Sequence, residues 1–250
     1  VELCEDLWTP CPPSSYHALQ GADIIANLSA SDELIGKHDY LLSLLKQQSA
    51  RCRAAYIYAS SGFGESSTDL VFAGNAIVAE CGTVVAESER FSFESQLVVT
   101  EVDVERLQGE RCVTNTFSSA SVAGKPYHTV DCSDIPVVPV HYTRTVAPHP
   151  FVPSHPETLD RRCREILDIQ ISGLAKRLLH THARTAVIGI SGGLDSTLAL
   201  LVCVQAFDKL SIPRDRIVGV TMPGFGTTDR TYQNAIGLMQ ALGVTVREIP

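Results

Sequence analysis

A glycine-rich loop between an apolar segment and a helical pattern constrains the fold of this chain more than any other feature. Residues 186–197 read AVIGISGGLDST, and residues 194–210 continue as an apolar helix. A glycine turn that joins a strand to a helix is typical of parallel α/β sheets. Glycines let backbone amides approach phosphate oxygens, and a helix N-terminus adds a favourable field. The loop therefore predicts a phosphate site on a parallel α/β domain.

The side chains of this loop indicate the phosphate chemistry. Ser191, Ser196 and Thr197 offer hydroxyl donors, whereas Asp195 cannot bind phosphate directly and makes sense beside a bridging magnesium ion. A Walker loop requires a Lys that this segment lacks. SGGLDS instead resembles the signature of the N-type ATP pyrophosphatases, which cleave ATP between its α and β phosphates. The alternative is a glycine turn with Ser and Asp helix caps.

The resemblance implies ATP and Mg²⁺ as cofactors, with Asp195 as the metal ligand. It implies that ATP is bound by the loop, that is by Gly189, Ile190, Ser191, Gly192, Gly193, Leu194, Asp195 and Ser196.

The pattern around the loop predicts the start of a doubly wound parallel sheet. Three strands are expected, the first of them buried, at residues 186–190, 217–222 and 244–249. Helices are expected at 194–210 and at 228–242, where Gly243 is the C-cap. An earlier helix begins at Glu157 and should dock its apolar face on this domain. Met222, at the end of the second strand, lies either beside the adenine of ATP or in the core.

The first part of the chain predicts an α/β layer with some antiparallel pairing. A helix is expected at residues 37–52, where apolar residues recur at helical spacing without Pro or Gly. Strands are expected at 23–28, 54–59, 76–79, 83–86 and 97–104.

A proline-rich stretch separates the two parts. Seven of the thirteen prolines lie between Pro126 and Pro156, and proline disfavours long regular elements. We therefore expect three zones: a first domain at 1–112, a linker at 113–156 and a second domain at 157–250.

Composition excludes several classes of function. The net charge of -8 disfavours a nucleic-acid partner, and no apolar run is long enough to span a membrane. The eight cysteines are spread out without a C-x-x-C pair, which favours reduced thiols in the cytoplasm. The opening VELCEDLW is no signal peptide. Both ends lie in strand-like runs, so we expect an internal fragment of a longer protein.

Cys4 leaves two interpretations open when it is judged by its neighbours alone. A thiol becomes a nucleophile where the thiolate is stabilised, and the adjacent Glu5 and Asp6 work against that. On this ground a buried structural cysteine is favoured. However, VELCEDLW, DIIANLSASDELIGK and GFGESSTDLVFAGNAIV resemble the C-terminal half of a nitrilase-type amidase with an αββα fold. The resemblance implies that Cys4 is the nucleophile of a Cys-Glu-Lys triad whose Glu and Lys precede this chain.

The order of the motifs resembles glutamine-dependent NAD+ synthetases. CEDLW, NLSAS and ESSTDL are followed by PFVP, GISGGLDST and TMPGFGTT, which together cover nearly the whole chain. The resemblance implies that ammonia, released from glutamine at Cys4, passes through a tunnel to an adenylated nicotinate adenine dinucleotide and forms NAD+. It also implies a cytoplasmic homo-oligomer.

By position, the resemblance assigns a glutamine pocket to Glu5, Trp8, Ser31 and Lys37. Trp8 is equally compatible with the core, and Lys37 with an exposed helix start. Thr227, Thr228 and Arg230 are weaker candidates for contact with the second substrate. Two other functions stay open: a nitrilase-type carbon-nitrogen hydrolase fused to another nucleotide-binding ligase domain, and a chain that only keeps binding contacts.

Overall fold

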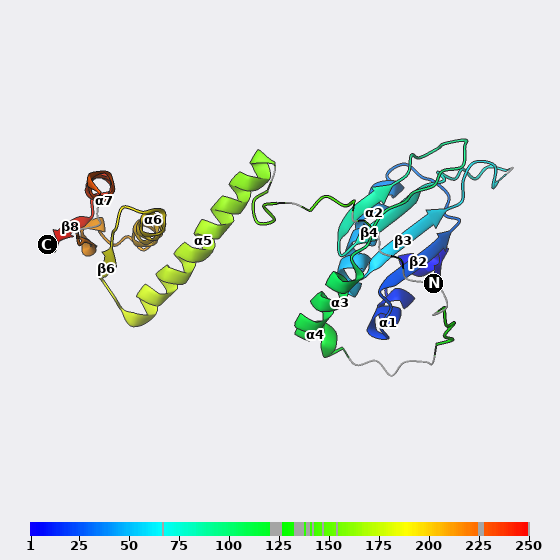
Figure 1. Ribbon diagram of the computed structural model, residues 1–250, viewed down its shortest axis with the longest axis horizontal. Coiled ribbons are helices and arrows are strands. Elements are labelled where there is room, and N and C mark those ends of the chain that lie inside the picture. Colours follow the sequence, from blue (N-terminus) through cyan, green and yellow to red (C-terminus); the bar gives the residue numbers. More distant parts are fainter. Residues whose placement is uncertain are drawn as a thin grey trace. The chain divides into compact units, whose positions relative to one another are not determined.

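The computed structural model describes residues 1–66, 68–120, 127–132, 138, 141, 143–146, 148–153, 155–224 and 228–249. The chain divides into two compact units, Val1–Thr145 and Val146–Pro250. Each unit has its own sheet (Figure 1). Each unit also has its own hydrophobic core. The α/β class that the sequence predicts is confirmed. The zone boundaries at 112 and 156 stay predictions.

Unit 1 contains a five-stranded mixed sheet in the order β1-β2-β3-β4-β5. β1 to β3 are parallel, and β3 to β5 are antiparallel. The strands are β1 (Glu2–Leu3), β2 (Ile24–Ser29), β3 (Ala55–Ser60), β4 (Ala76–Glu80) and β5 (Thr83–Glu87). The helical elements are the 3₁₀ helix η1 (Cys4–Trp8), α1 (Pro13–Leu19), α2 (Lys37–Cys52), α3 (Val104–Val113) and α4 (Asn115–Ser118).

The core of unit 1 lies between the sheet and the helices α1 and α2. Tyr56 and Tyr58 alternate along β3 toward this core, where Leu41 and Leu45 of α2 are also buried. The opposite face of the sheet carries exposed apolar side chains, among them Leu3, Ile24, Leu28 and Ile57. One face of this sheet is therefore packed, and the other is open among the described residues.

One strand prediction in unit 1 is wrong. No strand forms at residues 97–104, where Leu97 and Val99 are exposed. Instead, the Asp103 carboxylate accepts a hydrogen bond from the Arg106 amide and begins helix α3 at Val104. An N-cap at this point ends the extended run, which finds no paired strand among the described residues. Helices α1, α3 and α4 were not predicted.

Unit 2 contains a three-stranded parallel sheet in the order β6-β7-β8. This order in one direction is what the first half of a doubly wound sheet requires. The strands are β6 (Ala186–Gly189), β7 (Ile217–Thr221) and β8 (Thr245–Glu248). The helices are α5 (Pro156–Thr181), α6 (Leu194–Lys209), the 3₁₀ turn η2 (Arg214–Arg216) and α7 (Asp229–Leu242). The predicted Gly243 C-cap is confirmed, with φ of 71°.

Two details of unit 2 differ from the prediction. β6 is not fully buried, because its side chains alternate and Val187 is 71% exposed. Among the described residues, α5, α6 and α7 share one hydrophobic core with one face of this sheet, so the apolar strand β6 is half covered. Helix α5 docks only its C-terminal half, where Ile171 and Leu178 are buried, while Leu159 and Ile166 are exposed.

None of the helices in the described parts of the chain is long and apolar enough to cross a membrane.

Candidate functional site

Cys4 lies on a sharp bend at the carboxyl end of β1. Its φ is 42°, in the left-handed region that non-glycine residues seldom adopt. The Asp6 carboxylate accepts a hydrogen bond from the Leu3 amide at 2.9 Å and so stabilises the turn into η1. Asp6 is therefore a structural cap, and the bend presents the partly exposed thiol at the edge of the sheet.

Hydroxyl groups from the neighbouring strands contact this thiol. The Ser29 hydroxyl, at the end of β2, donates to Cys4 Sγ at 3.5 Å. The Tyr58 hydroxyl, on β3, donates to Ser29 Oγ at 3.0 Å. Sequence reasoning missed Ser29 and Tyr58, because only the register of β1, β2 and β3 brings them to Cys4.

A second polar network lies directly beneath the bend. The Glu2 carboxylate is 1% exposed and accepts hydrogen bonds from the Ser14 amide and, at 2.5 Å, from the Tyr56 hydroxyl. Asn27 Nδ2 donates to Tyr56 Oη at 3.1 Å and to the Cys4 carbonyl at 3.5 Å. Burial, and then the contact with Glu2, raise the pKa of Tyr56 far above its usual range. The backbone of Cys4 is thus tied to the interior.

The predicted glutamine-pocket residues lie on η1, on the segment after β2 and at the first residue of α2. Lys37 Nζ donates to the Asp32 carbonyl at 2.5 Å and lies 5.4 Å from the centroid of the Trp8 ring. Trp8 is half-buried, Ser31 is half-buried and Glu5 is exposed. Trp8 and Lys37 therefore lie side by side on a partly covered surface. Trp8 is not fully buried in the core, and Lys37 is not a fully exposed helix start. The roles of all four residues stay predictions.

An ion pair and a histidine–carboxylate contact hold the segment that carries Ser31 and Lys37. Arg90 Nη2 lies 3.2 Å from Glu33 Oε1, and His38 Nε2 lies 3.1 Å from Glu87 Oε1. The Glu33 amide also donates to the Val71 carbonyl at 2.7 Å. Contacts to distant parts of the unit hold this segment, although it has no regular structure before α2.

The predicted phosphate loop follows β6 and leads into α6. Its hydroxyls bond within the loop: Ser191 Oγ and Ser196 Oγ are 3.1 Å apart, and Ser196 Oγ donates to the Gly193 carbonyl at 3.1 Å. The Gly193 amide donates to Ser191 Oγ at 3.3 Å. The loop residues Gly189, Ser191, Gly193, Leu194 and Asp195 are exposed, whereas Ile190 is buried.

Gly192 is the position in this loop where only glycine fits. Its φ is 82°, and a Cβ atom there would lie 2.1 Å from the Thr231 carbonyl oxygen of α7. The loop and the first turn of α7 are therefore in direct contact. Thr228 caps α7 by accepting from the Thr231 amide at 3.3 Å.

Met222 follows β7 and is 65% exposed, so the core interpretation of this residue is wrong. Arg230, in the first turn of α7, is exposed as well. Thr227 lies outside the described residues. Within the part of the chain that is described, no group of three or more His, Cys, Asp or Glu side chains is placed to hold a metal ion.

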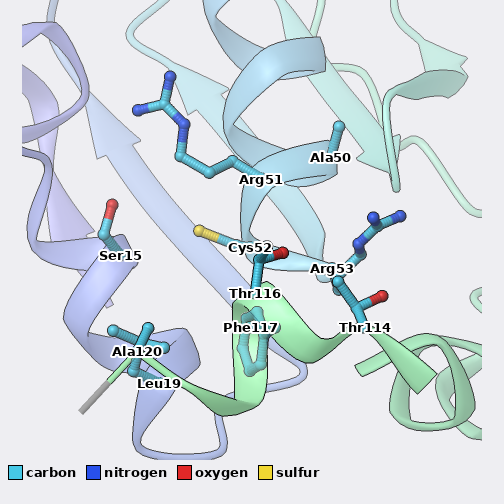
Figure 2. Close-up of a pocket in the computed structure, with 10 residues that line it drawn as sticks. All are labelled: Ser15, Leu19, Ala50, Arg51, Cys52, Arg53, Thr114, Thr116, Phe117 and Ala120. Atoms are coloured by element: carbon cyan, nitrogen blue, oxygen red, sulfur yellow. The ribbon is translucent and has the colours of Figure 1, made fainter. Parts of the chain in front are cut away.

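A separate cavity of about 390 Å³ opens in unit 1 at the end of α2. Figure 2 shows its lining side chains, which come from α1, from the end of α2 and from the segment around α4. Arg51 and Cys52 precede β3, whereas Cys4 and Ser29 lie at the carboxyl ends of β1 and β2. The cavity therefore lies away from the thiol, and no sequence motif points to it.

Comparison with known proteins gives matches for both units. Residues 166–250 match the family model for NAD synthase. A glutamine-dependent NAD(+) synthetase of Mycobacterium leprae is 43% identical over 254 residues, and one of Thermotoga maritima is 27% identical over 251 residues. Both alignments cover 100% of this chain, with 37% and 40% of the respective relatives.

The chain is similar over its whole length to glutamine-dependent NAD+ synthetases. The resemblance that the motifs predict is thereby confirmed. The chain spans little more than a third of the length of these curated relatives.

Among solved structures, a glutamine-dependent NAD+ synthetase from Acinetobacter baumannii in complex with adenosine diphosphate is 20% identical. The match has a TM-score of 0.37 and covers 99% of this chain and 38% of that one.

Proposed function

We propose that this chain carries parts of the two active sites of a glutamine-dependent NAD+ synthetase. The supporting observation is that one chain carries both Cys4, on the bend after β1, and the SGGLDS loop after β6. This chain is 43% identical to such an enzyme. Either feature alone is compatible with several families.

Cys4 is proposed as the nucleophile that attacks the side-chain amide of glutamine. Attack on the carbonyl carbon forms a thioester and releases ammonia, and water then hydrolyses the thioester to glutamate. The amino-acid end of glutamine is proposed to be held by Glu5, Trp8, Ser31 and Lys37. The bend supports this role because it exposes a reactive side chain while hydrogen bonds hold its backbone.

The loop at residues 189–196 is proposed to bind ATP. A carboxylate oxygen of nicotinate adenine dinucleotide attacks the α phosphorus and releases pyrophosphate. Ammonia then attacks the activated carbonyl carbon and displaces AMP, which yields NAD+. Adenylation is needed because a free carboxylate is a poor acyl donor. The exposed loop and the start of α6 support anion binding.

Magnesium fits the residues at the start of α6. The Asp195 carboxylate is exposed beside the loop hydroxyls, and oxygen ligands with phosphate oxygens suit Mg²⁺. Asp195 would hold the ion, which would neutralise phosphate charge. Met222, exposed at the end of β7, is proposed to face the adenine through its backbone.

A cytoplasmic homo-oligomer is also proposed. Eight free cysteines support a reducing compartment.

The test uses the full-length enzyme with nicotinate adenine dinucleotide, ATP and either glutamine or ammonia. Cys4→Ala should abolish the use of glutamine and leave the use of ammonia intact, whereas Cys11→Ala, at an exposed cysteine, should keep both. Asp195→Ala should remove NAD+ formation from either nitrogen source. Asp160→Ala, which removes an exposed acid of α5, is its matched control. Equal loss of both nitrogen sources in Cys4→Ala, or loss of neither, contradicts the two-site proposal.

A further inference from the structure

We propose that Tyr58 and Ser29 form a hydroxyl relay that donates a hydrogen bond to the sulfur of Cys4 and stabilises its thiolate. This inference rests on the proposed role of Cys4 as a nucleophile. It assigns Ser29 as a group that touches the reacting atom, and Tyr58 as a positioning residue that acts through Ser29.

The relay lies at one edge of the sheet, where three parallel strands end. Cys4 follows β1, Ser29 is the last residue of β2, and Tyr58 is two residues before the end of β3. The register pairs Leu3 with Leu28 and Ser29 with Ser60. It brings the Ser29 hydroxyl to 3.5 Å from Cys4 Sγ and the Tyr58 hydroxyl to 3.0 Å from Ser29 Oγ.

The direction of donation follows from the number of protons. A hydroxyl has one hydrogen to donate, and the hydrogen of Tyr58 is directed at Ser29. Ser29 accepts from Tyr58, so its own hydrogen is available for the sulfur of Cys4. Burial raises the pKa of Tyr58 above its ordinary value, so this hydroxyl stays protonated at neutral and mildly alkaline pH. The chain of donors therefore ends on sulfur.

The charged groups near Cys4 indicate why a hydroxyl donor is needed there. The charged groups on the adjoining segments are mostly acids: Glu2, Glu5 and Asp6 on β1 and η1, and Asp32, Glu33 and Lys37 after β2. Nearby acids disfavour a thiolate, and the ammonium of Lys37 already contacts Asp32. A neutral hydroxyl donor stabilises a thiolate without adding charge to the pocket. A relay anchored on a buried tyrosine holds that donor in place.

The experiment measures the thiol itself rather than turnover. In the full-length protein, the rate of Cys4 alkylation by iodoacetamide is followed from pH 6 to pH 10 by mass spectrometry of the Cys4 peptide. Tyr58→Phe and Ser29→Ala should each raise the midpoint of the profile by about 0.5 to 1 pH unit, the value of one hydrogen bond.

Tyr56→Phe is the matched control. It removes a buried hydroxyl from the same strand and the same face, but that hydroxyl contacts Glu2 and Asn27 rather than Ser29. It should lower stability and move the Cys4 midpoint less than Tyr58→Phe does, because Tyr56 reaches the Cys4 backbone only through Asn27 and does not contact the sulfur. A relay that merely supports the fold would predict equal midpoints in the Tyr58→Phe and Tyr56→Phe variants.

Two outcomes overturn the relay: an unchanged midpoint in Tyr58→Phe, or a shift of the same size in Tyr56→Phe. Tyr58→Phe keeps the test decisive if Ser29→Ala does not fold. The proposed enzymatic role has a separate test, because Cys4→Ala with unchanged use of glutamine refutes that role whatever the alkylation profile shows.

Discussion

Cys4 in unit 1 and the loop at residues 189–196 in unit 2 both follow the carboxyl end of a parallel strand, yet they are held in different ways. The thiol is positioned from beneath by buried side chains on β2 and β3. The hydroxyls of the loop bond within the loop, whereas its backbone contacts β7 at Val220 and α7 at Thr231.

This difference fits the role that is proposed for each group. A single sulfur atom needs one direction of approach, which side chains anchored in a core provide. A polyphosphate needs several donors around a concave backbone, which requires close approach of main chain rather than side-chain precision. Substitutions should therefore act through the interior in unit 1 and through backbone sterics in unit 2.

The largest expected effect is at Gly192. Gly192→Ala places a methyl group against the Thr231 carbonyl at a positive φ, so the loop must move. We expect ammonia-dependent NAD+ formation to fall by about 100-fold, because misplacement of a site by about 1 Å can cost that much. Gly237→Ala on α7, where a Cβ has free space, is the control and should keep activity. Wild-type turnover in Gly192→Ala would remove the backbone argument for unit 2.

The next effect is a loss of stability of unit 1 at alkaline pH. Burial raises the pKa of Cys52 from 9.0 to about 11. A raised folded pKa gives stability that is present below pH 9 and is lost as the pH rises toward 11. The loss amounts to about 3 kcal/mol for two pKa units. Urea unfolding followed by pulse proteolysis of unit 1 should show this loss in the unmodified protein and a smaller one in Cys52→Ala. Parallel losses in both proteins would contradict it.

A smaller effect tests the polar network under Cys4. Tyr56→Phe removes one hydrogen bond from the buried Glu2 carboxylate, which keeps the Ser14 amide, and one from Asn27, which keeps the Cys4 carbonyl; we expect a cost of about 1–3 kcal/mol. Hydrogen exchange of the β2 and β3 peptides in the full-length protein measures it. Tyr40→Phe, at an exposed tyrosine, should change protection little. Equal protection in the two variants would show that the interior does not hold the bend.

The smallest effect is at the cap of α7. Thr228→Ala removes the acceptor of the Thr231 amide and should cost about 1 kcal/mol, whereas Thr228→Ser keeps the oxygen. Hydrogen exchange of the first turn of α7 provides the measurement. This turn contacts the loop, so we expect the exchange of residues 191–193 to change as well. Faster exchange in α7 alone would show that the cap of α7 does not stabilise the loop.

Elements whose signals lie within the element could be predicted from the sequence. The helix at 37–52 has the predicted bounds, and Gly243 ends α7 as expected, because spacing and caps are local. The strand prediction at 97–104 is wrong because a run rich in Val does not reveal whether a partner strand exists. The burial of β6 was overestimated because it depends on what packs on the sheet.

The candidate site divides in the same way. Cys4 and the loop could be found from motifs, because the residues of each motif are consecutive in the sequence. Ser29 and Tyr58 could not, because their contact joins residues that are 29 positions apart and depends on strand register. Sequence reasoning thus pointed to the groups proposed to react but not to the side chains that contact them.

At position 4 the side chain proposed to react is a cysteine, whereas the left-handed backbone would be more stable with glycine. Glycine, and to a lesser degree asparagine, adopts such a φ more readily, so a cysteine here carries a backbone penalty of roughly 1 kcal/mol. Random mutation that relieves this penalty would also remove the sulfur. Under the proposed role of Cys4, a homologue that no longer uses glutamine should therefore lose this cysteine early, with little harm to its fold.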